Sequence, residues 1–281
     1  MNTVSLFNQA SYDCSQCITG RYSTSFSSAI RLLHADLRDP IYGIYGFVRL
    51  ADEIVDTFHD YDKDALLHKF EQDTWAAIGQ GISLNPILQS FQVTVNKYHI
   101  DPMLISSFFS SMRTDLEKKE WVDGGELNDY IYGSAEVVGL MCLQVFCEGD
   151  SRLAGELKDG ATALGAAFQK VNFLRDLRDD MQNLDRRYFP EVDPSRFSPE
   201  AKASIEKDIV QDFRRAYEGI GRLPAKARFG VLVAYKYYLC LFEKIKQLPP
   251  EALMRKRVRV PNFQKAWLLL KARLVPVMSG Q

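Results

Sequence analysis

The sequence predicts an all-α protein, and two observations support that fold class. The first is a set of capping side chains that stand directly before prolines, in the pairs Asp39-Pro40, Asn85-Pro86, Asp101-Pro102 and Ser198-Pro199. An Asp, Asn or Ser before a proline at the first helical position is a typical helix start. The second is that apolar residues recur at spacings of three and four rather than two, which indicates helices rather than strands.

The expected helices follow one another along the whole chain. Four of them begin at the capped prolines, and the others rest on the apolar spacing alone. In order, the ranges are 4–17, 22–34, 40–59, 63–78, 86–98, 102–119, 128–148, 151–158, 161–184, 199–219, 224–247 and 261–275.

The chain reads as a single domain over residues 1–281. No internal repeat, Ser/Gly linker or shift in composition divides it. Segment 185–197 contains Pro190 and Pro194 and few apolar residues, so we expect a loop there. Because the helices on both sides still carry apolar faces, this loop should lie at the rim of the domain rather than link two domains.

The composition excludes several classes of protein. Apolar residues make up 46% and charged residues 25%, which is typical of a globular chain rather than a disordered one. The formal net charge of -1 argues against a nucleic-acid partner. The longest apolar stretches, 137–146 and 231–242, fall short of the ~18–20 residues that span a bilayer. The N-terminus also lacks the pattern of a signal peptide.

The cysteines indicate a reducing compartment. Their number is five, which is odd, and a chain of this length does not need a disulfide framework. Cys14 and Cys17 have the spacing of a redox or zinc pair. No second pair accompanies them, so we assign them no chemistry. The expected location is therefore the cytoplasm.

Helix 40–59 is apolar nearly all round, except for one polar stripe. Tyr45, Arg49, Asp52 and Asp56 follow one another at spacings of four, three and four, which places them on one helical face. Two carboxylates four residues apart repel each other, and the repulsion grows when the helix is buried. We therefore expect a cation opposite this stripe.

Helix 161–184 carries a second stripe. Asn172, Asp176 and Asp180 lie at spacings of four on a helix whose other faces are apolar. Carboxylate and amide oxygens with no His or Cys nearby suit Mg²⁺, or Mn²⁺, rather than zinc. Mg²⁺ takes one or two protein carboxylates and completes its shell with water and phosphate oxygens. Two such stripes facing each other would hold a diphosphate through bridging metal ions.

A structural interpretation competes with this one. Either stripe could be a solvated acidic face that pairs with neighbouring basic residues. Arg49 and Arg175, each one turn from an aspartate, could likewise be internal salt-bridge partners rather than ligand contacts.

Four runs of residues resemble motifs of the squalene/phytoene synthases, which join two prenyl chains head to head. Ile41–Asp56 resembles the first aspartate-rich motif of that family and Gln169–Asp180 the second. Asp185–Pro190 resembles the Arg-x-Tyr-x-Pro loop that follows, and Ser23–Phe26 the Ser-x-Ser-Phe near the flap. Order and separation agree over about residues 15–270. The resemblance is greatest to bacterial phytoene synthases.

One element departs from the family pattern. The family usually has Tyr-Cys-x-x-Val-Ala-Gly-x-Val-Gly, and this chain has Tyr130 through Gly139 with Glu136 where a glycine normally stands. This difference bears on the shape of the cavity and hence on the substrate.

The resemblance implies an isoprenoid-synthase (terpenoid synthase) helical bundle with a central apolar cavity. It implies condensation of two geranylgeranyl diphosphates to phytoene through prephytoene diphosphate, with release of diphosphate, in carotenoid biosynthesis. The implied cofactor is Mg²⁺, or Mn²⁺, and no NADPH is expected. The implied metal-facing residues are Asp52, Asp56, Asn172, Asp176 and Asp180. The implied catalytic and substrate-binding residues further include Tyr45, Arg49, Gln169, Arg175, Arg186, Tyr188, Ser23, Phe26 and Tyr132.

Aromatic faces can stabilise a passing carbocation without attacking it. Phe26, Tyr45, Tyr132 and the segment 235–238 are candidates, and ordinary core packing is the alternative for each. The basic residues Arg255–Arg259 and Lys265 could close over diphosphate, touch anionic lipid or form a solvated helix end.

Two other functions are compatible with the same sequence features. One is a dehydrosqualene or squalene synthase acting on farnesyl diphosphate. The other is a non-catalytic assembly factor that keeps the fold. The expected partners are prenyl diphosphates and the inner membrane face, where a peripheral protein would meet its lipid-like substrate. We expect a monomer or weak dimer.

Overall fold

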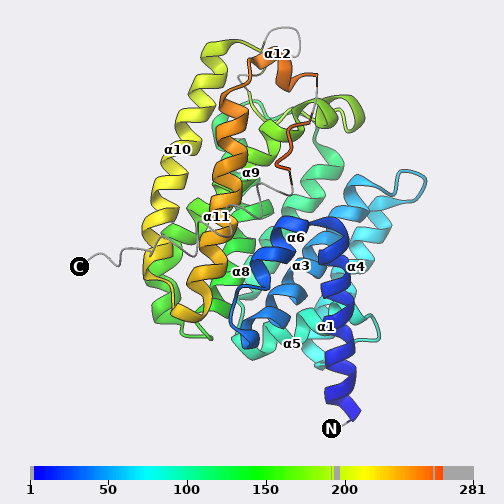
Figure 1. The fold of residues 1–281 in the computed structure, drawn as a ribbon. Coiled ribbons are helices and arrows are strands. Elements are labelled where there is room, and N and C mark those ends of the chain that lie inside the picture. Colours follow the sequence, from blue (N-terminus) through cyan, green and yellow to red (C-terminus); the bar gives the residue numbers. More distant parts are fainter. Residues whose placement is uncertain (1–2, 191, 193–196, 256, 262–281) are drawn as a thin grey trace.

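The computed structural model describes residues 3–190, 192, 197–255 and 257–261 (Figure 1). Within these residues every regular element is a helix, which confirms the all-α expectation, and an isolated bridge pairs Glu120 with Arg187. The elements are α1 (Thr3–Tyr22), α2 (Thr24–Ile30), α3 (Ala35–Asp56), α4 (Lys63–Gln80), α5 (Pro86–Tyr98), α6 (Pro102–Glu117), α7 (Gly124–Ile131), the π-helix η1 (Tyr132–Glu136), α8 (Val137–Phe146), α9 (Ser151–Asn183), α10 (Pro199–Arg222), α11 (Ala225–Lys246) and α12 (Pro250–Leu253).

Three of the four capped-proline starts are confirmed. Asn85, Asp101 and Ser198 each accept a hydrogen bond from a backbone N–H in the first turn of the helix that follows. The start at Pro40 is wrong, because α3 begins at Ala35 and Pro40 lies inside it. A proline there removes one backbone hydrogen bond. The buried side chains on both sides of it outweigh that loss through packing.

Three predicted boundaries also differ from the structure. Ranges 151–158 and 161–184 form the single helix α9, in which Gly160 lets α10 approach. A Cβ on Gly160 would lie 2.7 Å from the Cα of Gly219. Range 128–148 is divided between α7, η1 and α8. The first two helices meet at Ser23, with α2 ending at Ile30. The helix predicted over 261–275 lies outside the described residues, except for residue 261.

The helices α3, α8 and α9 lie in the middle of the bundle. In Figure 1, α10 and α11 flank them on one side and α1, α4 and α5 on the other, which agrees with the packing of α9 on α10 and of α3 on α1 and α5. Phe47 of α3 is fully buried and stacks on Phe91 with 3.8 Å between ring centroids. Among the described residues, we find no helix with both the length and the apolar character that a membrane span requires.

Candidate active site

A cavity of about 610 Å³ lies between α3 and α9, and its lining changes from apolar to charged along both helices. The lining residues run from Ile41, Ile44 and Val48 to Arg49, Asp52 and Asp56 on α3, and from Leu157, Ala161 and Leu164 to Asn172, Asp176 and Asp180 on α9. At the apolar end Ile30 and Leu157 are almost fully buried, whereas a third of the Asp52 side chain is accessible. The acidic end is therefore the mouth.

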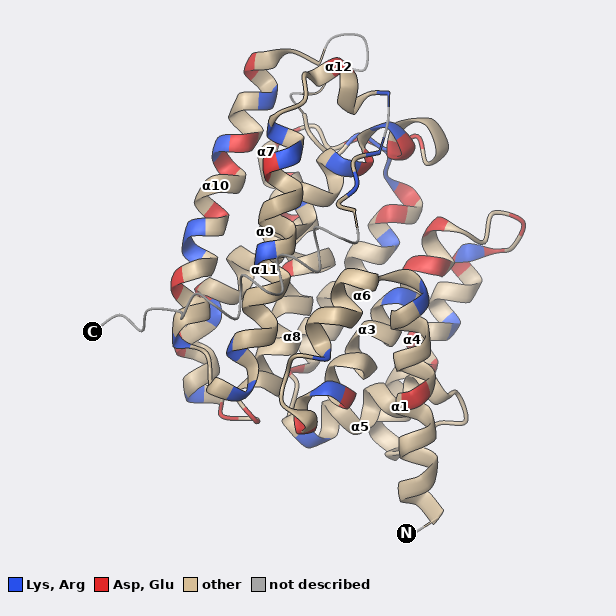
Figure 2. Cartoon of the chain, viewed as in Figure 1, with Lys and Arg blue, Asp and Glu red and all other residues tan. Residues whose placement is uncertain are grey.

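The two acidic stripes face each other across this mouth. Burial, the charge of Asp56 and, less strongly, that of Asp115 raise the pKa of Asp52 to about 7. Burial and the charges of Asp176 and Asp56 raise the pKa of Asp180 to about 8. Because Asp56 of α3 acts on Asp180 of α9, the stripes are close enough to repel each other. Figure 2 shows acidic and basic stretches together at the end of the bundle that carries α7 and α12.

Arginines compensate part of this negative charge. Arg49 pairs with Glu53 and lies 3.8 Å from Asp52, and its guanidinium carbon lies 4.3 Å from the ring centroid of Tyr22. Arg175 holds Asp176 through two hydrogen bonds, one of them 2.9 Å from Nε to Oδ1. In this structure both arginines are thus salt-bridge partners of the stripes and also line the cavity.

The donor set of the mouth fits divalent cations and a diphosphate. Neighbouring carboxylates contribute to the raised pKa of Asp52 and of Asp180, and a bound cation would relieve that repulsion. The Nε of Arg49 is buried and has no hydrogen-bond partner among the described residues, so a donor is left over at the mouth. Within the described part of the chain, no three His, Cys, Asp or Glu side chains form a ready metal cluster. A cation would therefore need ligand oxygens besides those of one carboxylate pair, as Mg²⁺ commonly does.

Aromatic rings and hydroxyls line the middle of the cavity. Phe26 lies 5.9 Å from the ring of Tyr45 and 6.0 Å from that of Phe168, which stacks on Tyr238 at 3.8 Å. The hydroxyl of Tyr238 donates to Oδ1 of Asn172 at 3.2 Å. Sequence reasoning considered Tyr238 only as part of a segment and did not single out Phe168.

Three further polar residues that the resemblance implies, Tyr45, Ser23 and Gln169, also line the cavity. Burial raises the pKa of Tyr45 to about 12, although Arg49 and a hydrogen bond with Ser23 oppose the rise. Ser23 caps α2 by accepting from the N–H of Phe26, and Gln169 lines the cavity beside Phe168.

The loop after α9 closes one wall of the cavity. Arg186 is 6% exposed, so the side chain that the resemblance implies as a diphosphate contact is nearly buried. It donates to Asp56 at 2.8 Å, and the ring of Tyr188 stacks on Phe173 with 3.8 Å between centroids. Both residues line the cavity.

Sequence reasoning missed Asp115 of α6, which also lines the cavity. Burial raises the pKa of Asp115 to about 7, although Arg186 and a hydrogen bond from Tyr130 oppose this. Its position was the available signal, because Asp115 continues the buried stripe of Phe108 and Met112 at spacings of four and three. A carboxylate on the apolar face of a helix requires a partner.

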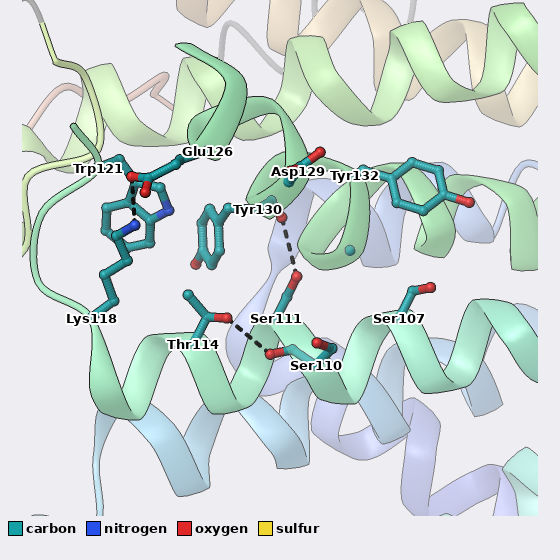
Figure 3. Close-up of a pocket in the computed structure, with 11 residues that line it drawn as sticks. Ser107, Ser110, Ser111, Thr114, Lys118, Trp121, Glu126, Asp129, Tyr130 and Tyr132 are labelled. Carbon is teal, nitrogen blue, oxygen red and sulfur yellow. Dashed lines mark hydrogen bonds and ion pairs between the residues drawn. The ribbon is translucent and has the colours of Figure 1, made fainter. Parts of the chain in front are cut away.

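Tyr132 lies apart from the other candidate residues. It does not line the cavity, is 38% exposed and contributes to a separate pocket with Ser107 and Ser110 (Figure 3). Tyr130 lines both spaces and so forms part of the wall between them. Residues two apart on a helix do not share a face, and the cavity face here carries Tyr130, Ser134 and Val138, so Tyr132 points elsewhere.

Glu136 does not line the cavity either. The charges of Asp212, Lys170 and Arg215 act on it, which places it toward α9 and α10, and its pKa is raised mainly by burial. The residue that departs from the family pattern is thus not one of the residues that line the cavity.

Of the basic segment near the C-terminus, Arg257 reaches the cavity. Arg255 and Arg259 are exposed, whereas Lys256 and Lys265 lie outside the described residues.

Residues 19–264 match the squalene/phytoene synthase family. The chain belongs to this family. Members of the family are prenyltransferases of the phytoene and squalene synthase type. The matched range contains nearly all of the helices described above.

Individual relatives agree with this assignment. The chain is 27% identical to a phytoene synthase of Arthrospira platensis over 94% of this chain and 93% of the relative. It is 25% identical to a 15-cis-phytoene synthase of a Paracoccus species over 88% of this chain and 86% of the relative. It is 27% identical to a 4,4'-diapophytoene synthase of Staphylococcus haemolyticus over 68% of this chain and 66% of the relative.

Solved structures share the fold. A dehydrosqualene synthase in complex with a ligand superposes with a TM-score of 0.80 at 20% identity, covering 95% of this chain and 96% of the other. The squalene synthase HpnC from Alicyclobacillus acidocaldarius superposes with a TM-score of 0.74 at 20% identity, covering 85% of this chain and 94% of the other. The isoprenoid-synthase type of bundle is thereby confirmed.

Proposed function

We propose that this protein joins two geranylgeranyl diphosphates head to head, through prephytoene diphosphate, to give phytoene for carotenoid biosynthesis. The observation that carries the proposal is the pairing of two opposed acidic stripes with an apolar cavity behind them. The diphosphates would lie at the charged mouth and the prenyl chains in the apolar interior. Phytoene synthases among the relatives support the choice of product.

The residues at the mouth would stabilise the negative charge that develops on the allylic diphosphate as it leaves. Asp52, Asp56, Asn172, Asp176 and Asp180 would hold Mg²⁺, or Mn²⁺, which neutralises the charge on the departing oxygens. Arg49 and Arg175 would add donors for those oxygens, since Arg49 has an unused N–H there.

The interior would protect and stabilise the carbocations. The rings of Phe26, Phe168 and Tyr238 offer π faces, which attract a cation but do not trap it. The apolar lining excludes water, which would otherwise convert the cation to an alcohol. Because the final cation loses a proton rather than accepting a hydride, the proposed reaction uses no NADPH.

The second candidate is a dehydrosqualene or squalene synthase that acts on farnesyl diphosphate. The Staphylococcus relative and the structural similarity to a dehydrosqualene synthase favour it. A non-catalytic assembly role is less well supported, because the acidic stripes and the cavity are both present.

Product analysis distinguishes these functions. Purified protein is incubated with geranylgeranyl or farnesyl diphosphate and Mg²⁺, with and without NADPH, and the hydrocarbons are identified by mass spectrometry. We expect phytoene from geranylgeranyl diphosphate without NADPH. Product from farnesyl diphosphate alone would favour the second candidate, and no product from either would favour the assembly role.

We further propose that the enzyme works in the cytoplasm at the inner membrane face, as a monomer or weak dimer. Its lipid-like substrate and the exposed Arg255 and Arg259 support that location. Co-sedimentation with anionic vesicles tests it.

A further inference from the structure

We propose that Asp115 is a positioning residue that acts through Arg186 to keep Asp56 available for a cation. The inference rests on the proposed function, because it assigns a task to a carboxylate pair at the mouth. Asp115 lies in the wall behind that pair and is not itself part of either acidic stripe.

The Asp115 carboxylate is fixed from one side by a tyrosine. Its side chain is 5% exposed, and the hydroxyl of Tyr130 donates to its two oxygens at 2.7 and 2.8 Å. Tyr130 is in turn held between other rings, since its ring centroid lies 4.6 Å from that of Trp121 and 5.6 Å from that of Tyr188. Figure 3 shows Tyr130 beside Trp121 above α6. The carboxylate therefore has little freedom to move.

On its other side, Asp115 faces Arg186. Nη1 of Arg186 lies 3.6 Å from Oδ1 of Asp115, and Nη2 donates to the backbone carbonyl of Asp115 at 3.1 Å. The same Nη1 donates to Oδ1 of Asp56 at 2.8 Å. One guanidinium group thus divides its charge between a buried carboxylate and a carboxylate of the first stripe.

Arg186 also connects the two stripes through its backbone. Its N–H donates to the carbonyl of Asp180 at 3.0 Å, at the end of α9, while its side chain reaches Asp56 at the end of α3. Asp185, with a φ of 54°, provides the left-handed turn that brings Arg186 back to this position. A shift of Arg186 would therefore alter both sides of the mouth.

The charge balance explains why a buried carboxylate is needed here. Without Asp115, the Arg186 charge would be balanced chiefly by Asp56, and the arginine would compete more strongly with a cation for that carboxylate. With Asp115 present, part of the attraction is directed into the wall. Such partners behind a ligand commonly change metal affinity by about 10–100-fold when they are removed.

The structure offers a matched control in Asp212. Its side chain is 2% exposed, and it pairs with Lys170 at 2.8 Å and with Arg215 at 2.6 Å. Unlike Asp115, it does not line the cavity. Asp212→Asn therefore removes a buried, paired carboxylate of the same type away from the mouth.

Two readouts test the proposal in the full-length protein at pH 8. The first is the rise in Tm that Mg²⁺ and inorganic diphosphate produce, recorded over a range of Mg²⁺ concentrations. The second is the Mg²⁺ concentration that half-saturates product formation. For Asp115→Asn, which preserves the shape and an acceptor for Tyr130, we expect both Mg²⁺ midpoints to increase about tenfold. For Asp212→Asn we expect a lower Tm without ligands and unchanged midpoints.

The outcomes separate this inference from the proposed function. Unchanged midpoints in Asp115→Asn, or an equal increase in Asp212→Asn, would overturn the positioning role and leave the function intact. A protein that makes no hydrocarbon, but whose ligand-induced Tm rise depends on Asp115, would overturn the function and keep the positioning role. A wild-type protein with no such rise would overturn both.

Discussion

Arg257 and Asp176 form an ion pair at the mouth of the cavity, with Nε of the arginine 2.7 Å from Oδ1 of the carboxylate. Arg257 follows α12, far along the chain from α9, and a basic side chain from the C-terminal region thereby reaches the second acidic stripe. Asp176 already pairs with Arg175, so two guanidinium groups share one carboxylate. In the proposed complex with a prenyl diphosphate, either arginine would exchange that carboxylate for phosphate oxygens.

This pair leads to a prediction about substrate binding. Arg257→Met should raise the KM for the prenyl diphosphate about tenfold, since a hydrogen bond to a charged group contributes roughly 1.5–3 kcal/mol. Arg255→Met is the control, because Arg255 is exposed and does not line the cavity. Steady-state kinetics measure the effect. Equal KM values in the two variants would show that Arg257 has no contact with the substrate.

The raised pKa values predict how pH affects stability without metal. Asp52 and Asp180, with pKa values of about 7 and 8, keep their protons in the folded protein to a higher pH than in the unfolded chain. Increasing pH therefore favours unfolding from about pH 4, where the unfolded carboxyls ionise, up to the folded pKa of about 7 or 8, where the folded ones have ionised as well. In the presence of a chelator, the Tm of Asp52→Asn and of Asp180→Asn should rise relative to wild type between about pH 4 and pH 8, and the difference should be constant above that range. Thermal denaturation checks this, and a Tm difference that does not vary with pH would contradict it.

The aromatic cluster predicts an effect on turnover. Phe168→Leu keeps an apolar side chain but removes the ring that stacks on Tyr238. Loss of a desolvated cation–π contact of about 2 kcal/mol corresponds to a decrease in kcat of about 30-fold. Phe91→Leu, in the core stack with Phe47, should lower Tm and leave kcat unchanged. A similar kcat for both variants would mean that Phe168 only packs.

The contact between α9 and α10 predicts opposite effects for two glycines on one helix. Gly160→Ala should destabilise the protein by about 1–3 kcal/mol, because the new Cβ would meet the backbone of Gly219. Gly155 has no atom within 4 Å of its built Cβ, so Gly155→Ala should stabilise it by about 0.5–1 kcal/mol. Urea denaturation measures both, and a stabilising Gly160→Ala would contradict the structure.

The sequence predicted features that depend on local chemistry. The caps at Asn85, Asp101 and Ser198 act within one turn of the chain, and the structure contains them. The stripes of Asp52 and Asp176 could be predicted because helical periodicity places their residues on one face. The structure brings both stripes to one cavity.

Features that depend on tertiary contacts could not be predicted in this way. Pro40 lies inside α3 because the packing of its buried neighbours stabilises the helix by more than the lost hydrogen bond costs. Gly160 lies within the continuous helix α9, where α10 packs against it. Asp115 is functional in our account only because Arg186, 71 residues later, folds back against it. No spacing in the sequence indicates that contact.

Product formation by Asp176→Asn tests the central claim most directly. The claim is that opposed acidic stripes hold divalent cations, which draw diphosphate from a prenyl chain. With geranylgeranyl diphosphate and saturating Mg²⁺, and with circular dichroism confirming a folded variant, we expect the rate to fall by about 10²–10³-fold, as for the loss of other electrostatic groups that stabilise developing charge. A folded Asp176→Asn protein that makes phytoene at the wild-type rate would contradict the claim.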